Sequence, residues 1–310
     1  MSDDIRSLDL DDFGRLCGID PADFPAQARQ IAETRDFRYR PIFGADRDAV
    51  LATIVRRIID GEMWVSGPDR RDVWETGWSE NLNEYLKTGS LSALTPKFLK
   101  PEVKRLFGDY VYPLSPSFEF DAVDVFRHYL FETFLRDVEA IYEFGCGSCQ
   151  HIPVYAALFP GRSITGLDWS EVSMEIIVHL IKDQGWPLQA RQFDFFQPDK
   201  DFDLTPNAGV VTVGGLEQLG RQFSPMLDWV VAQKPRMVVN VETLSELYDP
   251  DSLLDYLALK YDRRRNYLDG YLTALRQRES RGEITIHRVF RAGIGSQYHD
   301  SYCFVAWSPV

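Results

Sequence analysis

The segment Ile141–Gln150, with the sequence IYEFGCGSCQ, constrains the fold of this chain more than any other stretch. An apolar strand pattern runs into the acidic residue Glu143, and Gly145 and Gly147 follow before a helical pattern begins. Glycine is needed at such a turn because the backbone bends sharply and approaches a ligand with no side chain in the way. The segment therefore predicts the first strand-to-helix turn of a Rossmann-like nucleotide site.

From Ala140 onward, strand patterns alternate with helix patterns, as is typical of a parallel sheet whose strands are joined by helices. The apolar runs predict strands at Ala140–Phe144, Ser163–Leu167, Leu188–Phe193, Gly209–Val213 and Arg236–Val241. The periodic segments between and after them predict helices at Gln150–Leu158, Glu171–Gln184, Glu217–Ala232, Ser252–Lys260 and Arg263–Arg281. Two final apolar runs predict a C-terminal hairpin formed by Glu283–Phe290 and Tyr302–Trp307.

Residues 1–120 have a different pattern, which lacks strand alternation and carries helical patches. In Asp46–Asp60, for example, apolar residues recur every three or four positions. Tyr112–Pro116 has the composition of a linker, and an amphipathic helix is predicted at Asp121–Val138. With 310 residues the chain is long enough for two units. We expect a helical N-terminal domain at 1–120, acting as a lid or as a homodimer interface, and an α/β domain at 121–310.

Acidic residues stand at the ends of the first three predicted strands. Asp168 follows the second strand, 21 residues after Gly147, where a carboxylate can accept both hydroxyls of a ribose. Asp194 ends the third strand and is a candidate for the amino group of adenine. Two features disfavour a dinucleotide: Gln150 stands where that fingerprint requires a third glycine, and the carboxylate of Glu143 would repel a pyrophosphate.

The loop Glu143–Gly147, with the acids at the next strand ends, resembles the cofactor site of class I S-adenosylmethionine (SAM)-dependent methyltransferases. The resemblance covers residues 121–310 and implies a seven-stranded, mostly parallel sheet of order 3-2-1-4-5-7-6, with strand 7 antiparallel. It implies SAM as the cofactor and S-adenosylhomocysteine as the product, with Glu143 recruiting the methionine ammonium directly or through water. The residues that it assigns to cofactor binding are Glu143, Gly145, Cys146, Gly147, Asp168, Trp169, Asp194 and Phe195.

A narrower resemblance runs through Val213–Gly220 and Val241–Asp249. These segments are similar to those of bacterial methyltransferases encoded among polysaccharide and natural-product genes. The similarity implies an enzyme of secondary metabolism (EC 2.1.1.-) that methylates a small molecule. A non-catalytic SAM-binding subunit is the alternative from a different functional class, although the glycines and acids of the cofactor site are intact.

The acceptor is expected beyond the carboxyl ends of strands four and five, where ligands bind in open α/β sheets. Glu217, Glu242 and Glu246 follow these strands and are the candidate catalytic acids. Glu217 and Glu242 would grip a guanidinium, as pairs of glutamates do in protein arginine methyltransferases. N-methylation of a guanidino or amino group, such as that of arginine, is therefore the preferred hypothesis. Helix capping by Glu217 and a solvated Glu246 are the structural alternatives.

His299, in the loop of the predicted hairpin, is a candidate of another kind. The ordinary pKa of histidine is near 6.5, so a neutral imidazole can act as the general base for a hydroxyl acceptor. O-methylation of a sugar or polysaccharide precursor is the alternative function that would use it. A purely structural loop histidine explains the same residue without chemistry.

Charge restricts the expected partners. The chain has 34 Lys and Arg against 47 Asp and Glu, a net charge of −13, which repels phosphate backbones and anionic membranes. We therefore expect no nucleic-acid or membrane partner, and a small polar substrate that is preferably cationic. The run Asp262–Arg265 is interpreted as a solvated or interface face.

Cysteine content and the N-terminus bear on metals and location. Cys146 and Cys149 form a C-x-x-C without a second such pair, so no metal site is expected. Met1–Asp12 is acidic and has no apolar core of the kind found in signal peptides. No run of about 18 apolar residues occurs either, and we expect a cytoplasmic protein.

Overall fold

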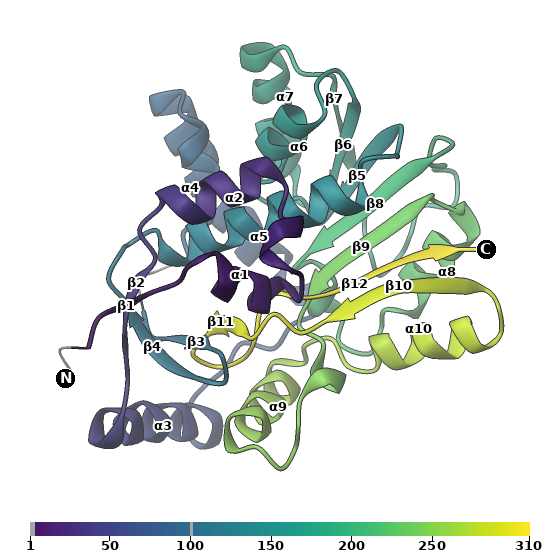
Figure 1. The fold of residues 1–310 in the computed structure, drawn as a ribbon. Coiled ribbons are helices and arrows are strands. Elements are labelled where there is room, and N and C mark those ends of the chain that lie inside the picture. The colour runs from purple at the N-terminus through teal and green to yellow at the C-terminus, as the bar shows by residue number, and fades with distance from the viewer. Residues whose placement is uncertain (1–3, 100–101) are drawn as a thin grey trace.

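The structure, a computed structural model, describes residues 4–99 and 102–310. Its central element is a seven-stranded sheet of order β10-β12-β9-β8-β5-β6-β7 (Figure 1). All pairings from β9 to β7 are parallel, whereas β12 is antiparallel to both of its neighbours. Counted along the chain, this is the order 3-2-1-4-5-7-6 with strand 7 antiparallel, so the predicted Rossmann-like class I methyltransferase fold is confirmed. The strands are β5 Ala140–Phe144, β6 Ser163–Asp168, β7 Leu188–Gln192, β8 Ala208–Val213, β9 Met237–Glu242, β10 Ile284–Phe290 and β12 Cys303–Pro309.

Helices cover both faces of this sheet because both faces are apolar. In β5, Ile141 packs with the cluster that includes α5, α6 and α7, whereas Tyr142 and Phe144 pack with α8 and α10 on the other face. Strands buried on both faces appear in a sequence as continuous apolar runs, which is why β5, β6, β8 and β9 were predictable. The helices are α5 Phe118–Phe134, α6 Ile152–Leu158, α7 Glu171–Gln184, α8 Ser224–Gln233, α9 Leu253–Arg265 and α10 Tyr271–Ser280.

One predicted helix, Glu217–Ala232, is divided in the structure. A short 3-10 helix, Leu216–Leu219, is followed by a turn and then by α8. Pro225 lies in the first turn of α8, where its missing N–H costs nothing. The division places Glu217 in a turn at the sheet edge and outside the long helix.

The N-terminal region contains the predicted helices and also strands that the sequence did not reveal. The helices are α1 Leu10–Cys17, α2 Ala26–Thr34, α3 Gly44–Ile59 and α4 Arg71–Thr88. The strands are β1 Arg6–Ser7, β2 Arg38–Pro41, β3 Lys104–Leu106 and β4 Asp109–Pro113. The expectation of a purely helical extension was therefore incomplete, because strands of two to five residues are too short to show alternation.

A second, five-stranded sheet joins the two ends of the chain. Its order is β1-β2-β4-β3-β11, and β11 Ile294–Ser296 comes from the connection between β10 and β12. The predicted C-terminal hairpin is thus present, but its connecting loop is fixed by pairing with β3. Because of this pairing, residues 296–302 lie at the edge of the central sheet.

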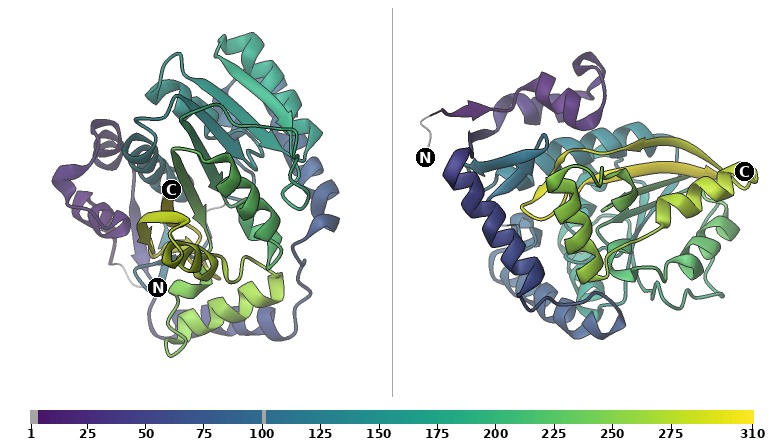
Figure 2. Two further views of the ribbon diagram at one scale, coloured as in Figure 1. Left: turned by 90° about the vertical axis from the view of Figure 1, so that its right-hand side faces the viewer. Right: turned by 90° about the horizontal axis from the view of Figure 1, so that it is seen from below.

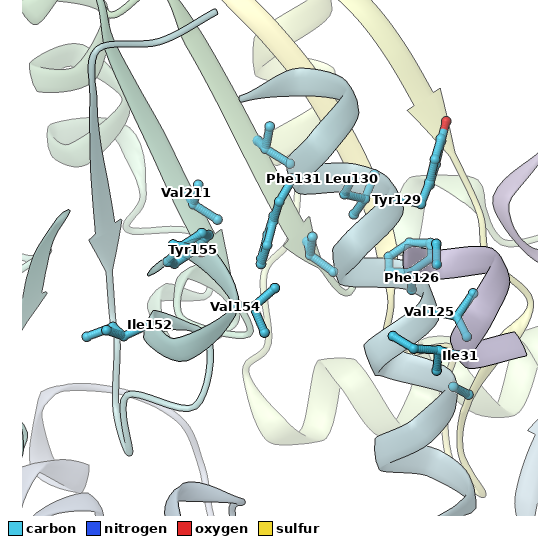
Figure 3. Packing of buried hydrophobic residues seen from close by; sticks show 14 of the residues in the cluster. Ile31, Val125, Phe126, Tyr129, Leu130, Phe131, Ile152, Val154, Tyr155 and Val211 are labelled. Atoms are coloured by element: carbon cyan, nitrogen blue, oxygen red, sulfur yellow. The ribbon is translucent and has the colours of Figure 1, made fainter. Parts of the chain in front are cut away.

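Helix α5 connects the N-terminal region to the central sheet. Figure 3 shows its side chains between those of α2 and α6, with Ile31 on one side and Tyr155 on the other. The rings of Phe131 and Tyr155 lie 4.5 Å apart. One continuous apolar cluster therefore spans both parts of the chain, and the division at residue 120 stays a prediction.

Helices α3 and α9 lie side by side at one edge of the molecule (Figure 1). Ile54 and Ile58 of α3 belong to the same cluster as Leu257 and Tyr261 of α9. The two ends of the chain lie at opposite ends of the molecule (Figures 1 and 2). Within 4–99 and 102–310, no helix has the length and apolarity to span a membrane. Residues 1–3 of the acidic N-terminal segment lie outside the described residues.

Candidate active site

A cavity of about 580 Å³ lies at the carboxyl ends of the parallel strands. Its walls come from the loops after β5, β6, β7 and β8, from residues 70–104, from the end of α9 and from the loop before β12. Of the predicted site residues, those that line it are Glu143, Gly145, Cys146, Gly147, Asp168, Trp169, Phe195, Glu217 and His299. Asp194, Glu242 and Glu246 are not among its lining residues.

The glycine loop after β5 has the backbone conformation that the sequence predicts. Gly145 and Gly147 have φ values of 72° and 53°, in the left-handed region that favours glycine. The N–H groups of Gly145 and Cys146 both donate to the carbonyl oxygen of Leu167, at 2.7 and 3.1 Å. A Cβ on Gly147 would lie 2.7 Å from the ring of Trp78. The loop thus needs glycine both for its bend and for the closeness of this ring.

Glu143 is buried at the end of β5, with 1% of its surface exposed. Its Oε2 makes no hydrogen bond of regular geometry among the residues described, although the hydroxyl of Tyr155 lies near enough to lower the pKa of this carboxyl. Burial raises the pKa of this carboxyl well above its ordinary value, and Arg127 opposes that rise. A buried acceptor without a partner is rare in folded proteins. At a cavity wall it fits the ammonium of a bound cofactor, as the sequence predicts.

Asp168 holds the glycine loop against the end of β6. Its Oδ2 accepts a hydrogen bond from the N–H of Gly147 and its Oδ1 accepts one from that of Ser170, both at 2.9 Å. Burial raises the pKa of Asp168 to about 6, and these two hydrogen bonds oppose the rise. Each carboxylate oxygen retains a second lone pair for a ligand hydroxyl. Asp168 therefore has a structural role beside its predicted role in ribose binding.

Asp194 does not line the cavity, so its predicted contact with adenine stays a prediction. The Oδ1 of Asp194 accepts a hydrogen bond from the N–H of Phe196 at 2.8 Å, in the turn after β7. Aromatic rings occupy this part of the wall: Trp169 and Phe196 are stacked, with centroids 6.1 Å apart. Phe195 lies beside them in the cavity wall. Phe196 was missed, although the aromatic run that contains it was visible in the sequence.

Glu242 lies beneath the cavity wall, where a contact with substrate had been expected. It is fully buried, and its two oxygens accept the N–H groups of Leu216 and Glu217 at 3.1 and 3.0 Å. Burial raises its pKa to about 8. Glu246 accepts the N–H of Thr273 at 3.2 Å. These carboxylates fix backbone turns, because the first turns of the short helix after β8 and of α10 leave N–H groups without helical partners.

Glu217 and His299 do reach the cavity. The Nδ1 of His299 lies 3.1 Å from an oxygen of Asp262 and 3.1 Å from Oγ1 of Thr243. Burial alone lowers the pKa of His299, but the carboxylates of Asp262 and Glu217 raise it above its ordinary value. Burial also raises the pKa of Glu217, and His299 and Arg265 oppose that rise. His299 is therefore a buried imidazole with one nitrogen fixed by a carboxylate.

Asp262 was not recognised from the sequence. It begins the run Asp262–Arg265, which had been interpreted as a solvated face, and it is 3% exposed. The neighbouring Arg263 and Arg264 are exposed as expected. Asp262 turns inward because the residues at i−1 and i−4, Tyr261 and Ala258, are on the buried face of α9. The helical period of α9 indicates that Asp262 is buried, whereas the charged residues next to it indicate an exposed segment.

Aromatic pairs from the N-terminal region and from α9 form further parts of the wall. Trp74 and Trp78 of α4 are stacked with centroids 5.4 Å apart. Tyr261 and Tyr298 are stacked at 4.4 Å, with an angle of 5° between the rings. Residues from 70–99 and 102–104 therefore line the cavity, and the expected role of the N-terminal region as a lid or as a dimer interface stays a prediction.

The environment of the cysteines does not indicate a catalytic or metal-binding role for them. Cys146 and Cys149 are buried and free. Burial and the adjacent thiol hold the pKa of Cys146 well above its ordinary value, so it is a poor nucleophile and metal ligand. Within the described ranges, no group of three or more His, Cys, Asp or Glu side chains is arranged to hold a metal ion.

No protein-family profile matches the chain, and no curated protein matches it. Among solved structures, a geranyl diphosphate methyltransferase is similar at 12% identity, over 78% of this chain and 97% of its own, with a TM-score of 0.43. The 16S rRNA methyltransferase RmtF is similar at 12% identity over 97% and 96%, with a TM-score of 0.42. The methyltransferase domain of bacterial CtHen1-CN is similar at 16% over 58% and 94%, with a TM-score of 0.39. Such distant similarities do not bear on activity, and the fold is defined by the strand order and directions of the sheet.

Proposed function

We propose that this protein is a SAM-dependent methyltransferase that acts on a hydroxyl group of a small acceptor. The sheet topology supports the cofactor part, as do three features of the cavity wall. These are the glycine loop, the unpartnered Oε2 of Glu143 for the methionine ammonium, and the carboxylate of Asp168 for the ribose. Trp169 and Phe196 would hold the adenine ring. When bound, SAM supplies a methyl group on a positively charged sulfur.

The observation that carries the acceptor class is the pair of His299 and Asp262 in the wall of the same cavity. Because Asp262 and Thr243 both lie 3.1 Å from Nδ1, Nε2 is left for the acceptor. His299 would take the hydroxyl proton on Nε2 as the acceptor oxygen bonds to the methyl carbon and the carbon–sulfur bond breaks. The carboxylate of Asp262 would fix the imidazole and stabilise its cationic form. The site would also have to align the acceptor oxygen with the methyl group of SAM.

A guanidino or amino acceptor is the second candidate. Of the two carboxylates of the expected clamp, Glu217 alone lies in the cavity wall, because Glu242 is engaged with backbone N–H groups beneath it. A single carboxylate cannot act as the expected clamp of two. A role in natural-product biosynthesis is part of the same proposal, and a non-catalytic SAM-binding subunit is the third candidate.

The test is a screen for SAM-dependent release of S-adenosylhomocysteine with hydroxylated acceptors, followed by the His299→Ala variant. General-base catalysis contributes about 10²- to 10⁴-fold, so we expect kcat to fall at least 100-fold while affinity for SAM stays within twofold. Since the base must be neutral and its pKa is raised, the wild-type rate should rise with pH through a midpoint above 6.5. Asp262→Asn removes the carboxylate that raises this pKa, and the midpoint should move to lower pH.

Three outcomes would contradict the proposal. An unchanged rate in His299→Ala would exclude the base. Transfer to arginine or an amine, abolished by Glu217→Gln and indifferent to His299→Ala, would establish the second candidate. Binding of SAM without transfer to any acceptor in the screen would favour the non-catalytic subunit.

A further inference from the structure

Two arginines in the cavity wall have donors without acceptors. Arg70 ends the short 3-10 helix Pro68–Arg70, and its Nε and Nη1 are buried without a hydrogen-bond partner among the described residues. Its guanidinium lies over Trp74, 5.6 Å from the ring centroid. Burial lowers the pKa of Arg70, and the nearby charge of Arg265 lowers it further. A partly buried cation beside a like charge, with buried donors left unpaired, is unfavourable unless an anion joins it.

Arg265 is the last residue of α9 and repeats this pattern. Its Nη1 donates to the hydroxyl of Tyr261 at 3.1 Å, while its buried Nε has no partner among the residues described. The guanidinium lies 4.8 Å from the ring centroid of Tyr267. Trp74 adds a third donor, because its Nε1 is also buried without an acceptor in the described part of the chain.

The third basic side chain of the wall is neutralised, and this sets the two arginines apart. Lys104 forms an ion pair with Glu119 at 2.5 Å, and both side chains are buried. Glu119 also accepts a hydrogen bond from the hydroxyl of Tyr302 at 2.9 Å. In residues 4–99 and 102–310, neither Arg70 nor Arg265 has a carboxylate within ion-pair distance. Glu217 interacts with Arg265 only through longer-range electrostatics. The Oε1 of Glu217 accepts a hydrogen bond from the side chain of Gln218.

We propose that Arg70 and Arg265 bind an oxyanion, a carboxylate or a phosphate, carried by the methyl acceptor. The planar guanidinium fork matches either group and binds it through paired N–H donors. The anion would supply the missing acceptors and screen the two like charges from each other. This inference rests on the proposed function only in naming the ligand as the acceptor. The acceptor class becomes a hydroxylated acid or a phosphorylated alcohol, in contrast to the cationic substrate expected from net charge.

Binding is tested without turnover, by isothermal titration calorimetry of the protein saturated with S-adenosylhomocysteine. The anionic probes are inorganic phosphate, phenyl phosphate and 4-hydroxybenzoate, and the neutral and cationic controls are 4-hydroxybenzyl alcohol and tyramine. Wild-type protein should bind at least one anion tenfold more tightly than both controls. A preference for phosphates over 4-hydroxybenzoate identifies the phosphate source, and the reverse identifies the carboxylate.

Arg70→Gln and Arg265→Gln should each weaken binding of the preferred anion at least tenfold. Arg263→Gln, on an exposed position of the same helix, is the matched control for net charge and should change it less than twofold. Circular dichroism and unchanged affinity for S-adenosylhomocysteine would establish that each variant folds. No preference for anions in the wild type, or equal effects of the three substitutions, would overturn the inference.

The same measurements separate this inference from the proposed function. If anions bind through Arg70 and Arg265 but no hydroxylated acceptor is methylated, the anion site stands and the methyl-transfer proposal fails. If hydroxylated anions are methylated no better than neutral alcohols, and equally well by wild type and Arg70→Gln, the methyl-transfer proposal stands and the anion site fails.

Discussion

The two halves of the cavity are assembled in opposite ways. The half proposed for the cofactor comes from consecutive strand ends, with Glu143, Asp168 and Phe196 at or just after β5, β6 and β7. The half proposed for the acceptor combines Arg70 from before α4 with Arg265 at the end of α9, and adds His299 from the loop before β12.

This difference explains which half the sequence revealed. In a parallel sheet, the carboxyl ends of neighbouring strands lie at one edge, so a residue's place in its strand gives its place in the site. Nothing comparable relates α4, α9 and β11, whose positions depend on packing between segments far apart in the chain. Cofactor residues are thus predictable from local order, whereas acceptor residues require the assembled structure.

The largest effect on the cofactor half is expected at Asp168. Asp168→Ala removes an acceptor for the Gly147 and Ser170 N–H groups as well as for a ligand hydroxyl. Because a hydrogen bond to a charged group contributes about 1.5–3 kcal/mol, affinity for S-adenosylhomocysteine should fall at least tenfold in calorimetry. Asp194→Ala is the control, since Asp194 bonds only the turn after β7, and should change affinity less than threefold. A larger effect at Asp194 would restore its predicted contact with adenine.

A somewhat smaller effect is expected at the glycine loop. Gly147→Ala places a Cβ where Trp78 lies and keeps a left-handed φ, so affinity for S-adenosylhomocysteine should fall about fivefold to tenfold. Gly161→Ala is the matched control, because Gly161 has φ 79° and no neighbouring atom within 4 Å of the added Cβ. Both variants should lose similar thermal stability, but Gly161→Ala should retain cofactor affinity. If both variants lost affinity for S-adenosylhomocysteine equally, backbone strain, and not the contact with Trp78, would explain the loss in Gly147→Ala.

The smallest effect on turnover is expected at Glu242. Its pKa is about 8 in the folded protein and near 4.5 in the unfolded chain. Between these values the unfolded chain releases the proton first, so the free energy of unfolding should fall as pH rises from about 4.5 to about 8. Urea denaturation of Glu242→Gln should show a flatter dependence, whereas Glu246→Gln should follow the wild type. The turnover of Glu242→Gln should change only a few-fold, and a 100-fold loss with a guanidino acceptor would re-establish the clamp.

Prediction failed where one residue type serves two physical roles. A carboxylate after a strand can face a ligand or cap a neighbouring backbone turn, and Glu242 does the second because the turn after β8 presents two N–H groups to it. Asp262 was hidden in a charged run in which Arg263 and Arg264 are exposed, since side-chain direction depends on the helix face. Net charge leads to a different expectation from that of the cavity wall, and the charge of the acceptor stays a prediction. Net charge is a property of the whole surface, whereas the cavity wall carries two arginines without ion-pair partners among the described residues.

The sequence by itself determined the α/β topology, the glycine loop and the acids of the first strand ends, because each depends on residues that are neighbours along the chain or in the sheet. It did not determine the second sheet or which segments far apart in the chain line the cavity together. Those depend on β3 pairing with β11 and on α3 packing against α9. Such contacts form between segments whose separate patterns are ordinary, and their free energy comes from apolar burial and backbone pairing that only the assembled chain provides.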